Sequence, residues 1–197
     1  MLVNALARVM WIANQDSFRG KLLQLFVAMA RPPWELSDEK LLAECRFEAF
    51  VGSGPGGQKR HKTNAAVRFT HVPSGISAVA SESRSQRENR IHALRRLRHK
   101  LAMEIRREVE DPVNYSPPGW FGEYPGLHIN SKNPRYPVAV AEVLDVLKAM
   151  QWSVGRAAVL LGATTSALTR FLHDDPALWT KVNQTRGGLG MKPLRWE

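Results

Sequence analysis

The hydrophobic pattern of residues 45–109 changes its period once, and this change constrains the fold more than any other feature. Three segments alternate apolar and polar side chains as β-strands do: residues 45–51, 65–71 and 76–81. A Pro-Ser-Gly sequence at residues 73–75 separates the last two segments and predicts a hairpin turn. From Ile91 to Val109, apolar residues recur at every third or fourth position, which predicts one buried face of a helix. We therefore expect an α+β fold in which a small, mainly antiparallel sheet packs against one long helix over residues 86–109.

Two serines have the sequence context of helix N-caps. Ser37 precedes a short helical segment that ends near Glu44. Ser85 is followed by Glu88 in the Ser-x-x-Glu pattern of a capping box, in which each side chain accepts a hydrogen bond from an amide of the first helical turn. This pattern predicts where the long helix begins.

The positive charge of the chain is concentrated in its middle. The chain has 28 Lys+Arg, 18 Asp+Glu and a formal net charge of +10. Residues 59–107 contain thirteen basic and three acidic side chains, whereas the segments before and after are neutral. A solvated basic face is one explanation, but a surplus confined to about fifty residues favours binding to the phosphate backbone of a nucleic acid.

The sequence suggests four successive parts. Residues 1–33 form an N-terminal extension, which we interpret as translated sequence upstream of a true start at Met29; an amphipathic helix or a targeting segment are the alternatives. Residues 34–110 contain the predicted sheet and long helix. Residues 111–137 hold six of the twelve prolines and several aromatic residues, which predicts a packed, irregular strap. A helical segment over residues 138–197 completes the chain.

Helical periodicity in this last part extends over four segments: residues 138–150, 153–161, 165–172 and 176–183. Asp175 is the expected N-cap of the fourth, with Pro176 at its first position. Ala158, Gly162 and Leu168 have the loose spacing of a helix-turn-helix. Because this part of the chain is electrically neutral, a small helical bundle with no nucleic-acid role is an equal alternative.

Composition excludes several other kinds of protein. With Cys45 as the single cysteine, the chain has no intramolecular disulfide and no cysteine-based zinc site, and a reducing compartment is expected. The histidines share no metal-ligand spacing, so we expect no metal and no cofactor. The longest apolar runs, such as residues 22–30, are too short to span a membrane.

A glycine-rich loop, Gly54-Pro55-Gly56-Gly57-Gln58, follows the first predicted strand. Paired glycines permit positive φ angles and let backbone N–H groups approach a substrate closely. Glutamine does not titrate near neutral pH, so this loop can stabilise an oxyanion but cannot itself deprotonate water. A phosphate-binding loop is excluded because residue 58 is not lysine. A simple glycine-rich turn is the remaining alternative.

A series of short motifs, in order, resembles the catalytic domain of class I peptide chain release factors and their short ribosome-rescue relatives. The motifs are residues 53–58, 62–63, 66–68, 71–76, 84–86, 89 and 93–94. The resemblance covers residues 34–107 and implies hydrolysis of the ester between nascent peptide and tRNA in the ribosomal peptidyl-transferase centre. It implies that Gly56 and Gly57 provide the conformation of a protruding catalytic loop. It also implies that the backbone N–H of Gln58 stabilises the developing oxyanion or leaving hydroxyl, while its side chain excludes nucleophiles larger than water.

The resemblance also implies partners. The ribosome, with its ribosomal RNA and peptidyl-tRNA, is the expected partner, and a glutamine methyltransferase acting on Gln58 is a second one. The expected RNA-binding residues are cationic: Lys59, Arg60, Lys62, Arg84, Arg87, Arg90, Arg95 and Arg96. The sequence departs from the family pattern at His61, where asparagine is usual, and in its sparsely basic C-terminal segment.

The preceding features predict a codon-independent release factor that rescues stalled ribosomes, because no codon-reading domain fits before the catalytic region. We expect a cytoplasmic monomer that does not associate with membranes. An alternative is a non-catalytic RNA-binding or ribosome-binding factor with a vestigial Gly-Gly-Gln loop. A third hypothesis, a DNA-binding regulator acting through residues 138–197, is disfavoured by the neutral charge of that part.

Overall fold

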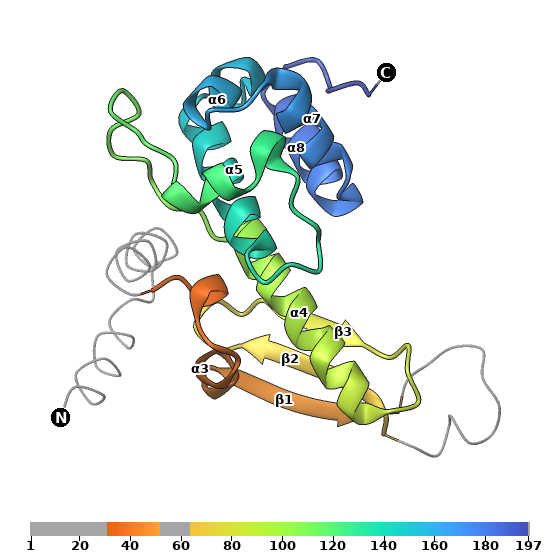
Figure 1. Cartoon of the computed structure of the whole chain (residues 1–197). Helices are drawn as coiled ribbons and strands as arrows, with labels where there is room; N and C mark the ends of the chain where they lie inside the picture. Colours follow the sequence, from red (N-terminus) through yellow and green to blue (C-terminus); the bar gives the residue numbers. More distant parts are fainter. Residues whose placement is uncertain (1–30, 52–63, 197) are drawn as a thin grey trace, which may run out of the picture.

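A single long helix, α4 (Gln86–Glu104), joins a small sheet at one end of the molecule to a bundle of helices at the other (Figure 1). The structure is a computed structural model that describes residues 31–51 and 64–196. Its α+β architecture confirms the fold class expected from the sequence.

The sheet has three antiparallel strands in the order β1-β2-β3: β1 (Cys45–Phe50), β2 (Ala66–His71) and β3 (Ser77–Ala80). Cys45 pairs with His71 and Phe50 with Ala66. The predicted hairpin joins β2 to β3, and the Gly75 amide donates to the His71 carbonyl at 2.8 Å. Gly75 has a φ of +71°, a left-handed conformation that glycine adopts without strain.

The segment before the sheet packs along α4. It contains a short 3-10 helix, η1 (Pro33–Glu35), and the predicted helix α3 (Asp38–Ala43), which Ser37 caps at the amide of Lys40. From α4, the Arg98 guanidinium donates to the carbonyls of Trp34 and Leu36 and to the carboxylate of Asp38 at 2.7 Å. Arg98 therefore holds the polypeptide that enters β1 against the long helix.

The buried face of α4 follows the predicted stripe in part. Leu94, Leu97 and Leu101 lie in the core, but Ile91 is 53% exposed. The helix also ends earlier than predicted, at Glu104 and not near Val109. Its continuation is interrupted because the Arg107 amide donates to the carboxylate of Asp145, 38 residues away, at 3.0 Å.

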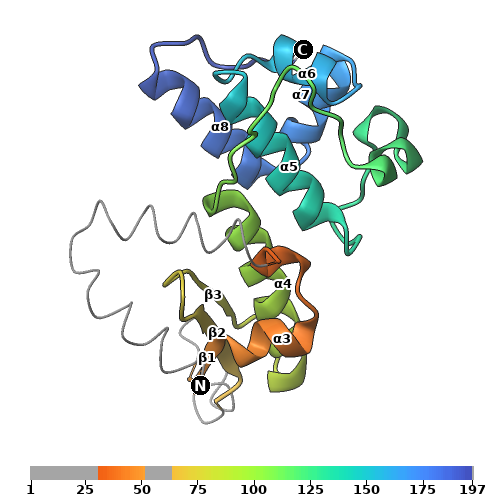
Figure 2. The ribbon, with the colours of Figure 1, turned by 90° about the vertical axis from the view of Figure 1, so that its left-hand side faces the viewer.

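Four α-helices form the bundle, and two 3-10 helices precede them (Figure 2). Their bounds are η3 (Gly119–Glu123), η4 (Pro125–Leu127), α5 (Tyr136–Ala149), α6 (Val154–Leu160), α7 (Thr165–His173) and α8 (Pro176–Gly188). Nearly all of α5 is buried because it packs between α4 and the later helices. Asp175 caps α8 as predicted, accepting from the amides of Ala177 and Leu178 at 3.0 and 3.1 Å.

A buried ionic contact joins the end of α4 to α5. Arg106 donates to Asp145 at 2.9 Å, and Arg107 reaches both Asp145 and Glu142, the latter at 2.9 Å. The hydroxyl of Tyr115 donates to Glu142 at 2.5 Å. Burial and then this hydrogen bond raise the pKa of Tyr115 well above its usual range, so the hydroxyl remains a donor. We call Arg106, Arg107, Glu142 and Asp145 the α4–α5 clamp.

A second polar contact joins α4 to the start of α8. The Nε2 atom of His99 lies 2.8 Å from the carboxylate of Asp175, and the Tyr136 hydroxyl donates to the same carboxylate at 2.9 Å. Burial alone raises the pKa of Asp175, but His99, the Leu178 amide and Tyr136 outweigh it and hold this pKa at about 2.

We predict that the substitution Asp145→Ala strongly destabilises the protein. Asp145 is 3% exposed, and its removal leaves Arg106 and Arg107 without their shared anion, which typically costs about 3–5 kcal/mol. Urea unfolding followed by circular dichroism measures the loss. Glu108→Ala is the matched control, because Glu108 is exposed and has no side-chain partner within the described ranges. Equal midpoints for the two variants would contradict a stabilising role for the clamp.

We also predict that Asp175 makes stability depend on pH in acid. Its folded-state pKa of about 2 lies below the ordinary value of 3.8, so the folded state binds fewer protons than the unfolded state in this window. The stabilisation is therefore complete at neutral pH and is lost as the pH falls from roughly 5 towards 2. Urea midpoints measured across this range should fall more steeply for the natural chain than for Asp175→Asn. Parallel curves would exclude this contribution.

Candidate nucleic-acid interface

The Gly-Gly-Gln segment connects two neighbouring strands. Since Phe50 pairs with Ala66, the chain leaves β1 and returns to β2 at the same end of the sheet. The predicted catalytic residues and three predicted RNA contacts lie outside the described residues, and their roles stay predictions: Gly56, Gly57, Gln58, Lys59, Arg60 and Lys62.

The first turns of α4 hold the returning end of this segment. The side-chain amide of Gln86 donates to the Asn64 carbonyl at 2.8 Å, and that of Asn89 donates to the Ala65 carbonyl at 2.7 Å. Asn89 is fully buried and also bonds both the carbonyl and the amide of Ser83. The N-terminal end of α4 is thus fixed beside the base of the Gly-Gly-Gln segment.

The capping box of α4 forms only in part. Ser85 accepts a hydrogen bond from the Glu88 amide at 3.3 Å, as predicted. The Glu88 carboxylate does not return to the Ser85 amide; it accepts from the Ser83 hydroxyl at 2.5 Å, and the Ser83 hydroxyl in turn accepts from the Ser85 amide at 3.0 Å. Ser83 therefore mediates the second half of the box and orders the turn that precedes α4.

One group of cations on and near α4 is bound within the protein. Arg96 donates to the Val79 carbonyl at 2.8 Å and pairs with Glu82. Lys100 donates to the Ser77 carbonyl at 3.1 Å. Together with Arg98 and the α4–α5 clamp, these side chains hold the sheet and the neighbouring helices to α4.

A second group of cations has no acidic partner. The exposed side chains of Arg84, Arg87 and Arg95 make no ion pair or hydrogen bond with the residues that the structure describes. Arg90 stacks over the ring of Phe47, with its guanidinium carbon 4.7 Å from the ring centroid. Within the described ranges, four of the five predicted RNA-binding arginines of this region therefore have no acidic partner, whereas Arg96 is bound to Glu82.

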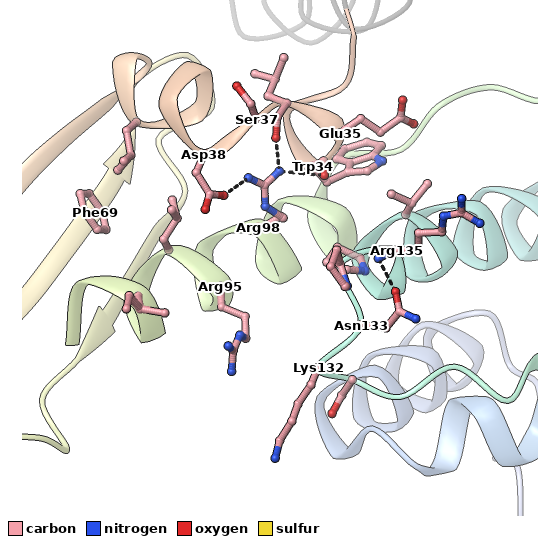
Figure 3. Close-up of a pocket in the computed structure, with 18 of the residues that line it drawn as sticks. Trp34, Glu35, Ser37, Asp38, Phe69, Arg95, Arg98, Lys132, Asn133 and Arg135 are labelled. Carbon is pink, nitrogen blue, oxygen red and sulfur yellow. Dashed lines mark hydrogen bonds and ion pairs between the residues drawn. The ribbon is translucent and has the colours of Figure 1, made fainter. Parts of the chain in front are cut away.

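Arg87, Arg90 and Arg95 line a groove of about 1200 Å³ between α4, η1 and the segment before α5. In Figure 3, Arg95 and Arg98 come from α4, whereas Lys132 and Arg135 lie on the facing segment. Seven of the lining side chains are cationic and three are acidic. Each acid is paired: Asp38 with Arg98 at 2.7 Å, and Glu142 and Glu35 with Arg107 at 2.9 and 3.8 Å.

The sequence did not identify the facing wall of this groove. Lys132 and Arg135 belong to a part of the chain whose charges cancel in sum, so no local excess pointed to them. Arg135 pairs with Glu123 and stacks over Trp120, whereas the Lys132 ammonium has no partner in residues 31–51 and 64–196. The only available signal was their position in a proline-rich, aromatic segment.

The titratable groups next to the sheet have structural roles. Both ring nitrogens of buried His71 have hydrogen-bonding neighbours, Ser74 at 2.7 Å and Glu44 at 3.0 Å. Burial and the nearby Glu44 raise the pKa of Cys45 to about 11, which leaves the thiol protonated and weakly nucleophilic at neutral pH. The described residues next to the sheet thus provide structural support and positive charge. This arrangement suits a site in which the loop acts through its backbone atoms.

No helix among residues 31–51 and 64–196 is both long and apolar enough to cross a bilayer. In these ranges, no three His, Cys, Asp or Glu side chains are grouped so that they could hold a metal ion.

The described residues thus form a small α+β domain, in which an antiparallel sheet carries a glycine-rich connection and is backed by an arginine-rich helix. Residues 40–116 match the family model of the RF-1 domain. The resemblance to release factors expected from the sequence is thereby confirmed for this part of the chain.

Curated relatives support the same assignment. The chain is 38% identical over 77 residues to peptide chain release factor 1 of Anaplasma marginale (strain Florida), covering 39% of this chain and 21% of that protein. It is 46% identical over 68 residues to peptide chain release factor 2 of Acidithiobacillus ferrooxidans, covering 34% and 19%. It is 30% identical over 124 residues to peptide chain release factor 2 of a Nitratiruptor species, covering 59% and 33%. The chain therefore spans about a fifth to a third of the length of these relatives.

We predict that Asn89→Ala destabilises the base of the Gly-Gly-Gln segment. The substitution removes the donors to the Ala65 and Ser83 carbonyls, at about 1–3 kcal/mol for each buried group left unsatisfied. Urea unfolding measures the effect. Gln86→Ala is the control, since exposed Gln86 supplies one hydrogen bond in the same region and should cost less than about 1.5 kcal/mol. A cost for Asn89→Ala no larger than that of the control would show that Asn89 does not anchor this region.

Proposed function

We propose that this protein hydrolyses the ester of peptidyl-tRNA in the ribosomal peptidyl-transferase centre, and that it does so without a stop codon, in the rescue of stalled ribosomes. The observation that carries the proposal is the RF-1 domain match over residues 40–116, which contains the Gly-Gly-Gln segment. The buried anchoring of the returning end of that segment by Asn89 supports it, because a loop that acts through backbone atoms needs a fixed base.

In the proposed reaction, water attacks the carbonyl carbon of the ester that joins the peptide to the tRNA 3′ oxygen. A bond forms from the water oxygen to the acyl carbon, the bond from that carbon to the tRNA 3′ oxygen breaks, and a proton from the water passes to this 3′ oxygen, which leaves as a hydroxyl. Gly56 and Gly57 provide the backbone conformation, and the backbone N–H of Gln58 stabilises the negative charge that develops on oxygen. The Gln58 side chain excludes nucleophiles larger than water.

The free cations of α4 and of the turn before it provide the proposed attachment to RNA. Arg84, Arg87, Arg90 and Arg95 are exposed and have no acidic partner among the described side chains, so they can bind phosphate without breaking an ion pair. Arg96 must first release Glu82 and is a weaker candidate. Lys59, Arg60 and Lys62 follow the Gly-Gly-Gln motif in the sequence and are further proposed RNA contacts.

The proposal includes partners and a place of action. The ribosome supplies the substrate and the groups that surround the reacting ester, and a glutamine methyltransferase modifies Gln58. The protein acts as a monomer in the cytoplasm, where ribosomes translate.

A non-catalytic RNA-binding or ribosome-binding factor is the second candidate. It is favoured by one observation, which is that the uncompensated arginines of α4 support RNA binding whether or not the Gly-Gly-Gln segment is active. Histidine at position 61, where the family usually has asparagine, adds to this alternative.

A peptide-release assay on ribosomes separates the two candidates. The protein is added to ribosomes that carry labelled peptidyl-tRNA and a truncated mRNA, a sense codon or a stop codon in the A site. We expect release from the complex with truncated mRNA, at a rate that a stop codon does not raise. Gly57→Ala should slow release by roughly a hundredfold or more, because it displaces the backbone donor of the neighbouring residue.

The control for this assay is Gly188→Ala, since a Cβ at Gly188 in α8 meets no atom within 4 Å. Ribosome binding by the natural chain without any release would identify the non-catalytic factor. Release that requires a stop codon would overturn the codon-independent part of the proposal.

A further inference from the structure

We infer that the groove between α4 and residues 131–138 is a two-walled binding site for an RNA strand, and that Lys132 completes it from outside the RF-1 domain match. The inference rests on the proposed function only in taking the ribosome as the source of the RNA, because the groove itself is defined by described residues. It adds a role for the segment between the sheet domain and the helical bundle.

The groove has more cationic than acidic side chains, and this excess positive charge favours binding of an external anion. Its three acids are already paired with Arg98 and Arg107. Arg87, Arg95 and Lys132 therefore face the groove with no negative partner in the described structure. Exposed cations left unpaired on two facing walls are the electrostatic pattern that a phosphate backbone neutralises.

Apolar and aromatic groups lie between these cations. Ile91 is 53% exposed although it belongs to the apolar stripe of α4, and it lines the groove. Trp120 lines the opposite side, where the guanidinium carbon of Arg135 lies 5.6 Å from its ring centroid. Single strands bind to such surfaces because bases stack on aromatic rings and on arginine while cations hold the backbone.

One end of the groove lies near the described contacts that hold the base of the Gly-Gly-Gln segment. Its cations begin at Arg87, in the first turn of α4, beside the Gln86 and Asn89 contacts that hold the base of the Gly-Gly-Gln segment. From Arg87 to Arg95 the helix rises about 12 Å, enough for several phosphates of one strand. A strand bound in the groove therefore lies along α4, between Arg87 near this base and Lys132 on the facing segment.

The two walls are held in a fixed relation by the α4–α5 clamp. Arg107 and Glu142 both line the groove, and their contact at 2.9 Å joins the helix of one wall to the helix that follows the other. The groove is thus formed before RNA binds, which lowers the entropic cost of binding.

An acidic polypeptide is the competing occupant. The observations favour RNA because guanidinium groups suit bidentate contacts to phosphate, and because exposed Ile91 and the Trp120–Arg135 pair line the groove beside these groups.

Fluorescence anisotropy with a labelled 12-nucleotide oligouridylate and the full-length protein tests the inference. Binding is measured over a range of salt concentrations for the triple variant Arg87→Gln, Arg95→Gln, Lys132→Gln. The matched control, Lys148→Gln, Lys192→Gln, Arg195→Gln, loses the same charge from exposed cations outside the groove lining. Unfolding midpoints establish that both variants are folded.

We expect the triple variant to lower the slope of log affinity against log salt by about 2, which corresponds to roughly 100-fold weaker binding at 0.1 M salt. Lys132→Gln alone should lower the slope by about 0.7, and the control variant should leave it unchanged. An unchanged slope for Lys132→Gln, equal effects of the groove and control variants, or absence of salt-dependent binding would each overturn the inference.

Competition distinguishes the two occupants. Unlabelled oligouridylate should displace the labelled strand at a much lower concentration than polyglutamate of equal charge, and equal potency would overturn the assignment to RNA. Groove-dependent RNA binding without peptide release would retain this inference and remove the proposed hydrolysis. Peptide release by the natural protein, together with normal RNA binding by the groove variants, would retain the proposed hydrolysis and overturn this inference.

Discussion

The contact of Arg106 and Arg107 with Asp145 is the interaction on which the arrangement of this molecule depends. It ends α4, because the Arg107 amide bonds a side chain of α5 and not the preceding helical turn. It also fixes the helical bundle relative to the sheet, because both arginines contact the buried carboxylate of Asp145 in α5. The two arginines follow the end of α4, and the carboxylate is buried in α5. Separating them would leave a buried charge without its partner, which is strongly destabilising.

Separation of the cations into two groups follows from this architecture. Arg96, Arg98 and Lys100 use carbonyls and carboxylates of neighbouring elements, so their charge serves the fold. Arg87 and Arg95 have no such neighbours among the described residues because they face the groove, where Lys132 lies on the opposite segment. A net charge of +10 therefore overstates the positive charge that is available to bind a polyanion, and it does not show where on the protein this charge lies. Only the packing of α4 identifies which charges remain free.

Local patterns predicted the elements well, and contacts between distant residues explain the differences. The strands, the Gly75 turn and the Asp175 cap each depend on neighbours within a few positions, so the sequence was sufficient for them. The end of α4 depends on Asp145, which no local pattern reveals. Ile91 fits the apolar period but faces a groove, since residues 131–138 lie opposite without covering it. For the candidate site, the motif and the arginines of α4 were evident, whereas Lys132 required the folded chain.

The pairing of Phe50 with Ala66 marks the point where the sheet ends and the Gly-Gly-Gln connection between β1 and β2 begins. Both ends of that segment belong to one antiparallel ladder, in which Cys45 pairs with His71 and Phe50 with Ala66. Lengthening such a connection twofold costs only about 0.6 kcal/mol in closure entropy. The span of the connection can therefore be adjusted to a deeper or shallower target during evolution, while the sheet and its backing helix keep the same sequence.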